Sequence, residues 1–285
     1  MKIAFLFPGQ GEQYVGMCKD IYEKYEDARK IYKKVSKEVN IDIEKISFEG
    51  PEDTLNETEN TQIAILTESL AILEILKNNN IQSDISAGLS LGEYSALINS
   101  GCLSFEEGVK LVKKRGEYMQ KFLPVGNWKM AAIIGLNEEQ IESVCRNTKN
   151  GFVTPANYNT EGQIVISGEE EAVIEAGNEA KKMGARKVIM LNTAGPFHTI
   201  KLEKAAHEFR KELENVTINK FNSKVVKNID GTIYNKEDDI KEILEKHMIN
   251  PVRFTKTIKT ILEFGADIII EIGPRKNFIK FCKKD

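Results

Sequence analysis

Histidine, cysteine and tryptophan are scarce in this sequence, and their scarcity narrows the chemistry that the chain can perform. The 285 residues include three histidines, four cysteines and one tryptophan. The cysteines lie far apart and form no C-x-x-C pair, so neither a zinc site nor a disulfide framework is indicated. Reduced, structural cysteines are typical of a cytoplasmic protein. We therefore predict a cytoplasmic location and no bound metal or redox cofactor.

Long apolar runs and a strong excess of one charge are also missing. The longest apolar helical stretch, residues 63–76, is interrupted by Glu68, Ser69 and Glu74, which makes it a poor membrane span. Residues 2–7 are too few for the apolar core of a signal peptide. The formal net charge of −3 provides no overall field that would attract nucleic acid or anionic lipid. We expect neither a nucleic-acid partner nor a membrane partner.

Short apolar runs alternate with amphipathic segments along the chain, which is the pattern of an α/β protein. The helix expected at 61–77 is apolar on most sides and should be buried. A charged helical region is predicted at 17–39, and the other predicted helices are 93–100, 105–122, 201–213, 238–248 and 255–264. The predicted strands of the main sheet are 2–7, 84–87, 224–229 and 267–272.

Residues 129–191 follow an order of their own. Four short apolar runs and two helices alternate there as β-α-β-β-α-β, and the first helix opens with a capping-box sequence at 137–140. This is the ferredoxin-like order. We predict an α/β protein in which a larger, α/β-hydrolase-like subdomain with a parallel sheet (1–124 and 193–285) carries an inserted, smaller ferredoxin-like subdomain (125–192).

The sequence G-L-S-L-G at 88–92 matches the nucleophile elbow G-x-S-x-G. A predicted strand precedes it and a predicted helix follows, as that motif requires. Such a turn presents the serine hydroxyl at a helix N-terminus, where free N–H groups favour a developing oxyanion. The pentapeptide alone also occurs in ordinary loops, so the flanking strand and helix carry the prediction that Ser90 is a nucleophile.

A serine nucleophile needs a base, and only three histidines are available. His207 falls on the polar face of its helix and is expected to be solvated. His247 ends a charged helix, and its side chain is expected to be ordinary. His198 follows a strand at a strand-to-helix junction, where active-site loops of open α/β sheets gather. With Ser90 present, His198 is the favoured base.

The glycine-rich loop F-P-G-Q-G at 7–11 directly follows the first strand. A dinucleotide fingerprint would need a third glycine where Tyr14 stands, and no G-K-[ST] phosphate loop occurs. The loop is better suited to offering backbone N–H groups to an oxyanion near Ser90. Arg115 stands among lysines, and geometry alone does not distinguish it from a solvated helix face.

Taken together, these motifs resemble the malonyl-CoA:acyl carrier protein transacylases of fatty acid synthesis over nearly the whole chain. Each matching segment is short, but their joint occurrence in this order is specific. The segments are F-P-G-Q-G at 7–11, N-T-Q at 60–62, 88–94, R-G at 115–116, A-N-Y-N at 156–159, 163–168, G-P-F-H at 195–198, N-P-V-R at 250–253 and E-I-G-P at 271–274. One departure is Leu89, where the family usually has histidine.

The resemblance implies a role for each site residue and no acidic third member of a triad. The implied roles are nucleophile for Ser90, base for His198, oxyanion-hole N–H donors for Gln10 and Leu91, a backbone carbonyl of His247 that orients His198, a carboxylate-binding Arg115, and substrate-pocket residues Gln62, Phe197, Asn157 and Asn228. Asn228 lies in another segment, near the site. Phe197 resembles the pattern of malonyl-selective relatives.

The resemblance also implies the partners. Malonyl-CoA would be the substrate, no cofactor would stay bound, and the acceptor would be the phosphopantetheine thiol of an acyl carrier protein; a monomer is expected. A trans-acting acyltransferase of a polyketide pathway, a serine thioesterase or hydrolase, a catalytically silent docking module and a dinucleotide-binding oxidoreductase are the alternatives. The residues considered for a basic docking patch are Lys110, Lys113, Lys114, Arg275, Lys276 and Lys280.

Overall fold

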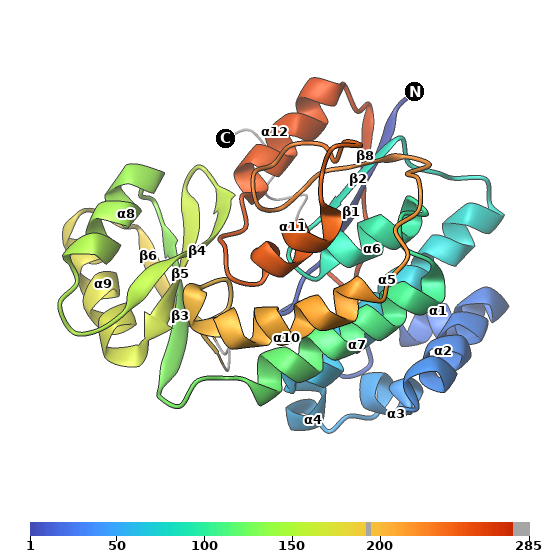
Figure 1. The fold of residues 1–285 in the computed structure, drawn as a ribbon, viewed down its shortest axis with the longest axis horizontal. Helices are drawn as coiled ribbons and strands as arrows, with labels where there is room; N and C mark the ends of the chain where they lie inside the picture. The colour runs from blue at the N-terminus through green and yellow to red at the C-terminus, as the bar shows by residue number, and fades with distance from the viewer. Residues whose placement is uncertain (192–194, 276–285) are drawn as a thin grey trace.

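Two separate four-stranded sheets organise the chain (Figure 1). The computed structural model describes residues 1–191 and 195–275. In the larger sheet the strand order is β7-β2-β1-β8, and all neighbours run parallel. Its strands are β1 (Ile3–Phe7), β2 (Ile85–Gly88), β7 (Lys224–Val225) and β8 (Ile268–Glu271).

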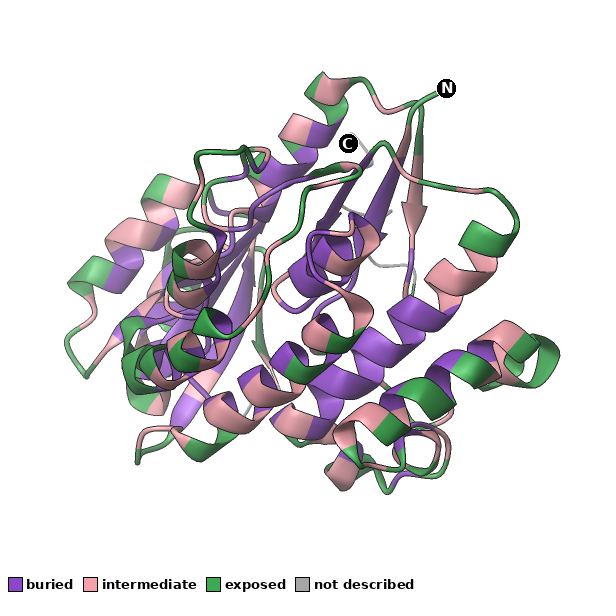
Figure 2. Ribbon diagram, turned by 45° about the vertical axis from the view of Figure 1, so that its right-hand side comes forward, coloured by how far each residue is buried: buried purple, intermediate pink, exposed green. Residues whose placement is uncertain are grey.

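Helices cover both faces of the larger sheet, as a parallel sheet requires. Alternate residues of β1 point to opposite faces. Phe5 and Phe7 join the main core with the long helix α5 (Thr58–Asn78), whereas Ala4 and Leu6 pack against α12 (Phe254–Phe264). Burial is concentrated on β1, β2 and α5, whereas β8 and the outer helix faces carry exposed or half-buried residues (Figure 2).

The remaining helices of the larger part surround α5. They are α1 (Lys19–Lys24), α2 (Glu26–Val39), α3 (Ile43–Phe48), α4 (Glu52–Asn56), α6 (Gly92–Asn99), α7 (Phe105–Lys121), the 3-10 turn η1 (Ile200–Leu202), α10 (Glu203–Glu214) and α11 (Ile240–His247). The prediction for 61–77 is confirmed, because thirteen α5 residues from Thr58 to Ala71 are buried.

The smaller sheet is antiparallel and has the order β4-β5-β3-β6. Its elements run β-α-β-β-α-β: β3 (Trp128–Ile134), α8 (Glu138–Asn147), β4 (Val153–Thr160), β5 (Gln163–Glu169), α9 (Glu170–Lys182) and β6 (Lys187–Leu191). The capping box predicted at 137–140 is present at the start of α8. Both halves of the predicted fold class, a parallel sheet and a ferredoxin-like unit, are therefore confirmed.

The two faces of the smaller sheet have different partners. Ala131 and Ile133 of β3 belong to a local core under α8 and α9. Met130 and Ala132, which point the other way, belong to the main core of the larger part. The smaller sheet therefore turns one face toward the larger sheet, and the space between the two is where a site can form.

The structure refines or corrects three sequence expectations about elements. The helical region predicted at 17–39 consists of two helices, α1 and α2, because Tyr25 between them has an extended backbone with φ −113° and ψ 124°. The strand expected over 224–229 covers only β7, since Val226 already pairs with Ile233 in an isolated bridge. Helices α3 and α4 were not predicted; five or six residues are too few to show a helical period.

The proposed division at 124/125 stays a prediction, and the second boundary at 192/193 lies outside the described residues. Across the described part of the chain, no helix is both long enough and apolar enough to cross a membrane.

Candidate active site

The nucleophile elbow forms between β2 and α6 and depends on two glycines. A Cβ on Gly88 would lie 1.9 Å from the backbone carbon of Gly92, and one on Gly92 would lie 2.2 Å from the carbonyl oxygen of Phe7. No side chain fits at either position. The tight turn between them holds Ser90 at φ 54°, a left-handed conformation that is rare outside glycine.

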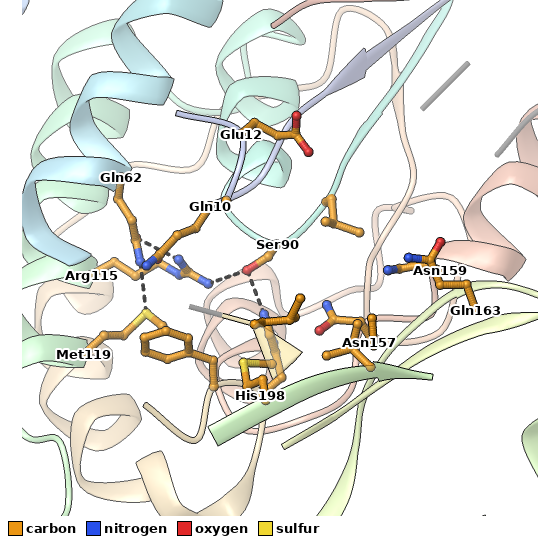
Figure 3. Close-up of a pocket in the computed structure, with 17 residues that line it drawn as sticks. Gln10, Glu12, Gln62, Ser90, Arg115, Met119, Asn157, Asn159, Gln163 and His198 are labelled. Carbon is orange, nitrogen blue, oxygen red and sulfur yellow. Dashed lines mark hydrogen bonds between the residues drawn. The ribbon is translucent and has the colours of Figure 1, made fainter. Parts of the chain in front are cut away.

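Ser90 lies between a base and a cation. Its Oγ is 2.7 Å from Nε2 of His198 and accepts a hydrogen bond from Nη2 of Arg115 at 3.0 Å. Figure 3 shows the side chains of His198 and Arg115 both directed at Ser90. The predicted pair of Ser90 and His198, separated by 108 residues in sequence, is thus brought into hydrogen-bond contact.

The tautomer of His198 follows from its neighbours. Its Nδ1 lies 3.0 Å from the carbonyl oxygen of His247 and 3.2 Å from that of Asn250. Carbonyl oxygens only accept, so Nδ1 carries the proton and Nε2 is the free acceptor facing Ser90. Burial, and secondly the charge of Arg115, lower the pKa of His198 to about 4. The ring is therefore a neutral base at physiological pH.

Arg115 is a buried cation with few partners. Its side chain is 1% exposed, and Nη1 donates to Oε1 of Gln62 at 2.7 Å. The Gln62 amide in turn donates to the sulfur of Met119. Nε of Arg115 has no hydrogen-bond partner, and no carboxylate within the described residues forms an ion pair with it. Burial lowers the pKa of Arg115. A guanidinium in this state is suited to receive an anion.

These groups open into a cavity of about 450 Å³ between the two sheets. The larger part contributes Gln10, Gly11, Glu12, Gln62, Leu89, Ser90, Arg115, Met119, Phe197 and His198, and the smaller sheet contributes Met130, Ala132, Asn157, Asn159, Gln163, Val165 and Leu191. The wall combines apolar side chains with polar ones, and the polar groups lie around Ser90 in the larger part and at Asn157, Asn159 and Gln163 in the smaller sheet.

The chain matches known proteins over nearly its full length. Residues 4–283 match the family described as "Acyl transferase domain". The malonyl CoA-acyl carrier protein transacylase of Bacillus subtilis is 40% identical, covering 99% of this chain and 90% of that protein. The chain belongs to the malonyl-CoA:acyl carrier protein transacylase family. It is therefore an acyltransferase.

Solved structures agree with this membership. The crystal structure of the malonyl CoA-acyl carrier protein transacylase from Clostridium perfringens superposes with a TM-score of 0.94 at 44% identity, covering 100% of this chain and 90% of that one. A malonyl-transacylase in complex with a type II polyketide acyl-carrier protein has a TM-score of 0.95 at 35% identity, covering 99% and 92%.

The structure also locates the oxyanion-hole candidates of this family member. Gln10 lines the cavity, on the loop after β1, and Leu91 is buried at the start of α6. Neither backbone N–H donates a hydrogen bond within the part of the chain that is described. A Cβ on Gly9 would lie 2.6 Å from the carbonyl oxygen of Leu89, so the loop and the elbow are in contact, as the sequence suggested.

The remaining pocket candidates divide into two groups. Gln62, Phe197 and Asn157 line the cavity. Asn228 does not: it is fully buried behind the elbow, where Oδ1 accepts the N–H of Ser90 at 2.7 Å and Nδ2 donates to the carbonyl of Gly88 at 2.7 Å. Its geometry is that of a residue that holds the elbow.

The backbone carbonyl of His247 lies where it was expected, but its side chain does not. Its carbonyl does lie at Nδ1 of His198, as the family resemblance implied. Its side chain, expected to be ordinary, is fully buried, and its ring centroid is 5.3 Å from that of His198. The charged sequence of α11 hides this position because His247 lies with Ile240 and Leu244 on the one buried face of the helix. His207 is exposed, as predicted.

Other groups near the reacting atoms were missed by the sequence analysis. Asn250 supplies a second carbonyl at His198, and Glu93 and Tyr234 form a buried pair beneath the elbow with an O···O distance of 2.6 Å. Met119, Met130 and Leu191 complete the apolar wall of the cavity. No chemical motif marks these residues, although Glu93 and Asn250 stand inside the family-matching segments 88–94 and 250–253.

The lysines considered for a docking patch are mostly paired. Lys110 contacts Glu38 at 2.9 Å, Lys113 contacts Glu59 at 3.0 Å, and Lys114 contacts Glu117 at 3.0 Å. Arg275 lies over the ring of Tyr14, and Lys276 and Lys280 lie outside the described residues. Within the described ranges, no cluster of His, Cys, Asp and Glu could hold a metal ion.

Proposed function

We propose that this protein transfers the malonyl group of malonyl-CoA to the phosphopantetheine thiol of an acyl carrier protein, through a malonyl-Ser90 intermediate, and so supplies fatty acid synthesis. The observation that carries the proposal is the buried guanidinium of Arg115, which forms no ion pair with a carboxylate of the described residues and lies 3.0 Å from the nucleophilic oxygen. A serine esterase has no need of such a cation.

The closeness of Arg115 to Ser90 also limits the length of the acyl group. The same two residues must bind a free carboxylate and attack a thioester carbonyl, so the two carbons must be near neighbours in the substrate. One methylene between them, as in malonyl, fits that requirement. An unbranched acyl group without a carboxylate would leave the guanidinium unpaired in a closed pocket, which disfavours its binding.

In the first half-reaction the proton of the Ser90 hydroxyl passes to Nε2 of His198 while Oγ forms a bond to the thioester carbon. The backbone N–H groups of Gln10 and Leu91 stabilise the oxyanion, a contribution of roughly 3 kcal/mol per donor in comparable sites. The carbon–sulfur bond then breaks, and the proton on Nε2 goes to the departing coenzyme A thiolate. The protein is left as the malonyl ester of Ser90.

The second half-reaction runs the same steps in reverse with a new thiol. The phosphopantetheine thiol gives its proton to Nε2 of His198 and its sulfur bonds to the ester carbon. The carbon–Oγ bond breaks, and Ser90 recovers its proton from His198. The carbonyls of His247 and Asn250 hold the Nδ1 proton throughout, so the ring keeps one orientation.

The other candidates take supporting roles. Gln62 holds the guanidinium of Arg115 in place, and Phe197 and Asn157 shape the pocket around the acyl group. Asn228 does not bind the substrate. Its two side-chain hydrogen bonds hold the backbone of the elbow instead.

The carrier-protein partner is proposed by analogy with the relative that binds a polyketide acyl-carrier protein. Service to a polyketide pathway in trans is the second candidate, and that relative is the observation that favours it. A monomer in the cytoplasm, with neither nucleic acid nor membrane as partner, remains our prediction.

Transfer and hydrolysis can be separated directly. Wild-type protein is mixed with malonyl-CoA, with and without a phosphopantetheinylated carrier protein, and both free thiol and malonyl carrier protein are followed over time. We expect malonyl carrier protein to accumulate in step with released coenzyme A, and little release without an acceptor. Steady release without an acceptor would identify a thioesterase instead.

A further inference from the structure

A second layer of buried polar groups lies behind Ser90 and His198. Glu93, in the first turn of α6, is fully buried. Its carboxylate accepts hydrogen bonds from the hydroxyl of Tyr234 at 2.6 Å and from the backbone N–H of Asn228 at 3.2 Å. Glu93 is not among the residues that line the cavity, so it does not meet the substrate.

Glu93 is linked to the nucleophile through Asn228. The carboxylate fixes the backbone of Asn228, whose side chain bonds the N–H of Ser90 and the carbonyl of Gly88, one on each side of the elbow. Ser90 has a positive φ, so it keeps its conformation only while its surroundings hold it. The chain of contacts from Glu93 to Ser90 provides such a hold.

Glu93 is linked to the base through His247. One carboxylate oxygen lies 3.4 Å from Nδ1 of His247, and both residues are fully buried. The ring of His247 lies against that of His198, tilted by 34°. Neither ring nitrogen of His247 has a hydrogen-bond partner within the described part of the chain. The imidazole of His247 therefore separates the carboxylate from the catalytic ring.

The positive charge that develops on His198 during the reaction can be stabilised by this carboxylate. When His198 takes the proton of Ser90, it becomes a cation beside Arg115. Within the described ranges, no carboxylate forms an ion pair with either residue. Arg115 is then engaged by the malonyl carboxylate, so the buried imidazolium of His198 has no anion of its own, and a negative charge one ring away lowers the barrier.

We infer that Glu93 is a positioning residue for the acyl transfer: its carboxylate holds the elbow through Asn228 and, from behind His247, supplies the negative charge that favours the imidazolium of His198. The inference rests on the proposed function. It concerns how the reaction is supported and leaves the reacting atoms as assigned above.

The titration of Glu93 makes the inference testable. Burial raises the pKa of Glu93 to about 7, while Tyr234, the Asn228 N–H and Arg115 lower it and Asp230 raises it. His247 faces the same carboxylate, and burial holds its pKa well below the usual value. Glu93 therefore changes from neutral to charged as the pH rises through about 7. His198, with a pKa of about 4, stays neutral over that range.

The experiment follows the single-turnover formation of malonyl-enzyme by quenched mixing and intact-protein mass spectrometry, from about pH 5.5 to about pH 9. No acceptor thiol is present, so its titration does not interfere. The wild-type rate is expected to rise through about pH 7. Glu93→Gln should react at least about tenfold more slowly at high pH and show no rise, with the apparent KM for malonyl-CoA within about twofold of the wild type.

Two further variants make the result specific. Tyr234→Phe removes a donor to the carboxylate, so the rise should move to higher pH. Glu68→Gln changes another buried glutamate, on α5 and outside the cavity lining, and should keep the wild-type profile.

A Glu93→Gln protein that reacts at the wild-type rate with the wild-type pH profile would overturn the inference and leave the proposed function intact. If circular dichroism shows that Glu93→Gln does not fold, Tyr234→Phe decides, and an unmoved rise would overturn the inference. Failure of the wild type itself to form malonyl-enzyme would instead reject the proposed function.

Discussion

Arg115 is a buried cation that forms no ion pair with any carboxylate of the described residues. Its hydrogen bonds go to an amide and a hydroxyl, and its guanidinium lies 5.5 Å from the ring centroid of Tyr94. Removing a charge from water without pairing it opposes folding by several kcal/mol. This unfavourable free energy is explained if the carboxylate of a bound substrate forms an ion pair with Arg115. The planar guanidinium matters as well, because it can bind a carboxylate with two parallel hydrogen bonds.

Substituting Arg115 should therefore reduce the preference for malonyl-CoA over acetyl-CoA more than it reduces the rate of acyl transfer itself. In Arg115→Ala we expect kcat/KM for malonyl-CoA to fall roughly 10²–10³-fold, from the loss of about 3–4 kcal/mol of charged hydrogen bonding, while acetyl-CoA changes far less. Initial rates of thiol release with the two donors measure this. Arg146→Ala, which alters an exposed arginine of α8, is the matched control. An unchanged ratio of malonyl to acetyl rates would contradict the role of Arg115.

Single site residues could be predicted from the sequence where the chemistry allows only one or a few residue types, as for a nucleophile and its base. Ser90 was identified by its elbow and His198 by elimination among three histidines. Arg115 could not be distinguished from its lysine neighbours by pattern, and only the family resemblance selected it. Glu93 and the ring of His247 carry no motif, because their importance arises from burial beneath residues that are more than a hundred positions away in sequence.

At the scale of elements, the elbow is a contact between β1, β2 and α6 at which only glycine fits. Gly92→Ala would place a methyl group 2.2 Å from the Phe7 carbonyl oxygen. We expect it to lower the free energy of unfolding by about 1–3 kcal/mol and to reduce malonyl-enzyme formation strongly, because α6 and Ser90 must shift. Chemical denaturation and the single-turnover rate measure the two effects.

Gly162→Ala is the control for this prediction. A Cβ at Gly162, in the turn between β4 and β5, would meet no atom within 4 Å. That variant should keep both stability and rate. If Gly92→Ala behaved in the same way as Gly162→Ala, the close packing assigned to the elbow would be wrong.

Elements could be predicted where the hydrophobic period was long enough to read. Helix α5 and the β-α-β-β-α-β unit were recognised because apolar residues recur over many positions. The break at Tyr25 and the short helices α3 and α4 were not, since their ends are set by tertiary contacts and by one or two backbone angles. The cavity forms where the smaller sheet packs against the larger part of the chain. This packing depends on tertiary contacts, which the local pattern of apolar residues does not reveal.

At the scale of the whole molecule, stability should depend on pH through buried carboxyl groups. Burial, with the charge of Asp20, raises the pKa of Glu68 to about 8. Its folded-state pKa is above its unfolded value, so its contribution to stability is complete below about pH 4.5 and is lost as the pH rises through about 8. The native protein should therefore become less stable on the alkaline side.

Glu68→Gln should remove the part of this pH dependence that comes from Glu68 and leave the part that comes from Glu93. Between about pH 5 and about pH 9 the free energy of unfolding of the wild type should fall by roughly 2–5 kcal/mol more than that of the variant. Urea denaturation at both pH values measures the difference. Glu263→Gln, at an exposed position of α12, should follow the wild type. Parallel curves for the wild type and Glu68→Gln would show that the carboxyl group does not titrate in this range.

The central claim is that Ser90 lies in the cavity between the two sheets, is activated by His198 and forms an ester with the malonyl group. Intact-protein mass spectrometry after brief mixing with malonyl-CoA, and separately with acetyl-CoA, tests it most directly in the wild type and in Ser90→Ala. The account predicts a malonyl mass increment on the wild type alone, little or none with acetyl-CoA, and its discharge by a phosphopantetheinylated carrier protein. A wild type that forms no adduct and releases no coenzyme A would contradict the account and favour a catalytically silent docking module.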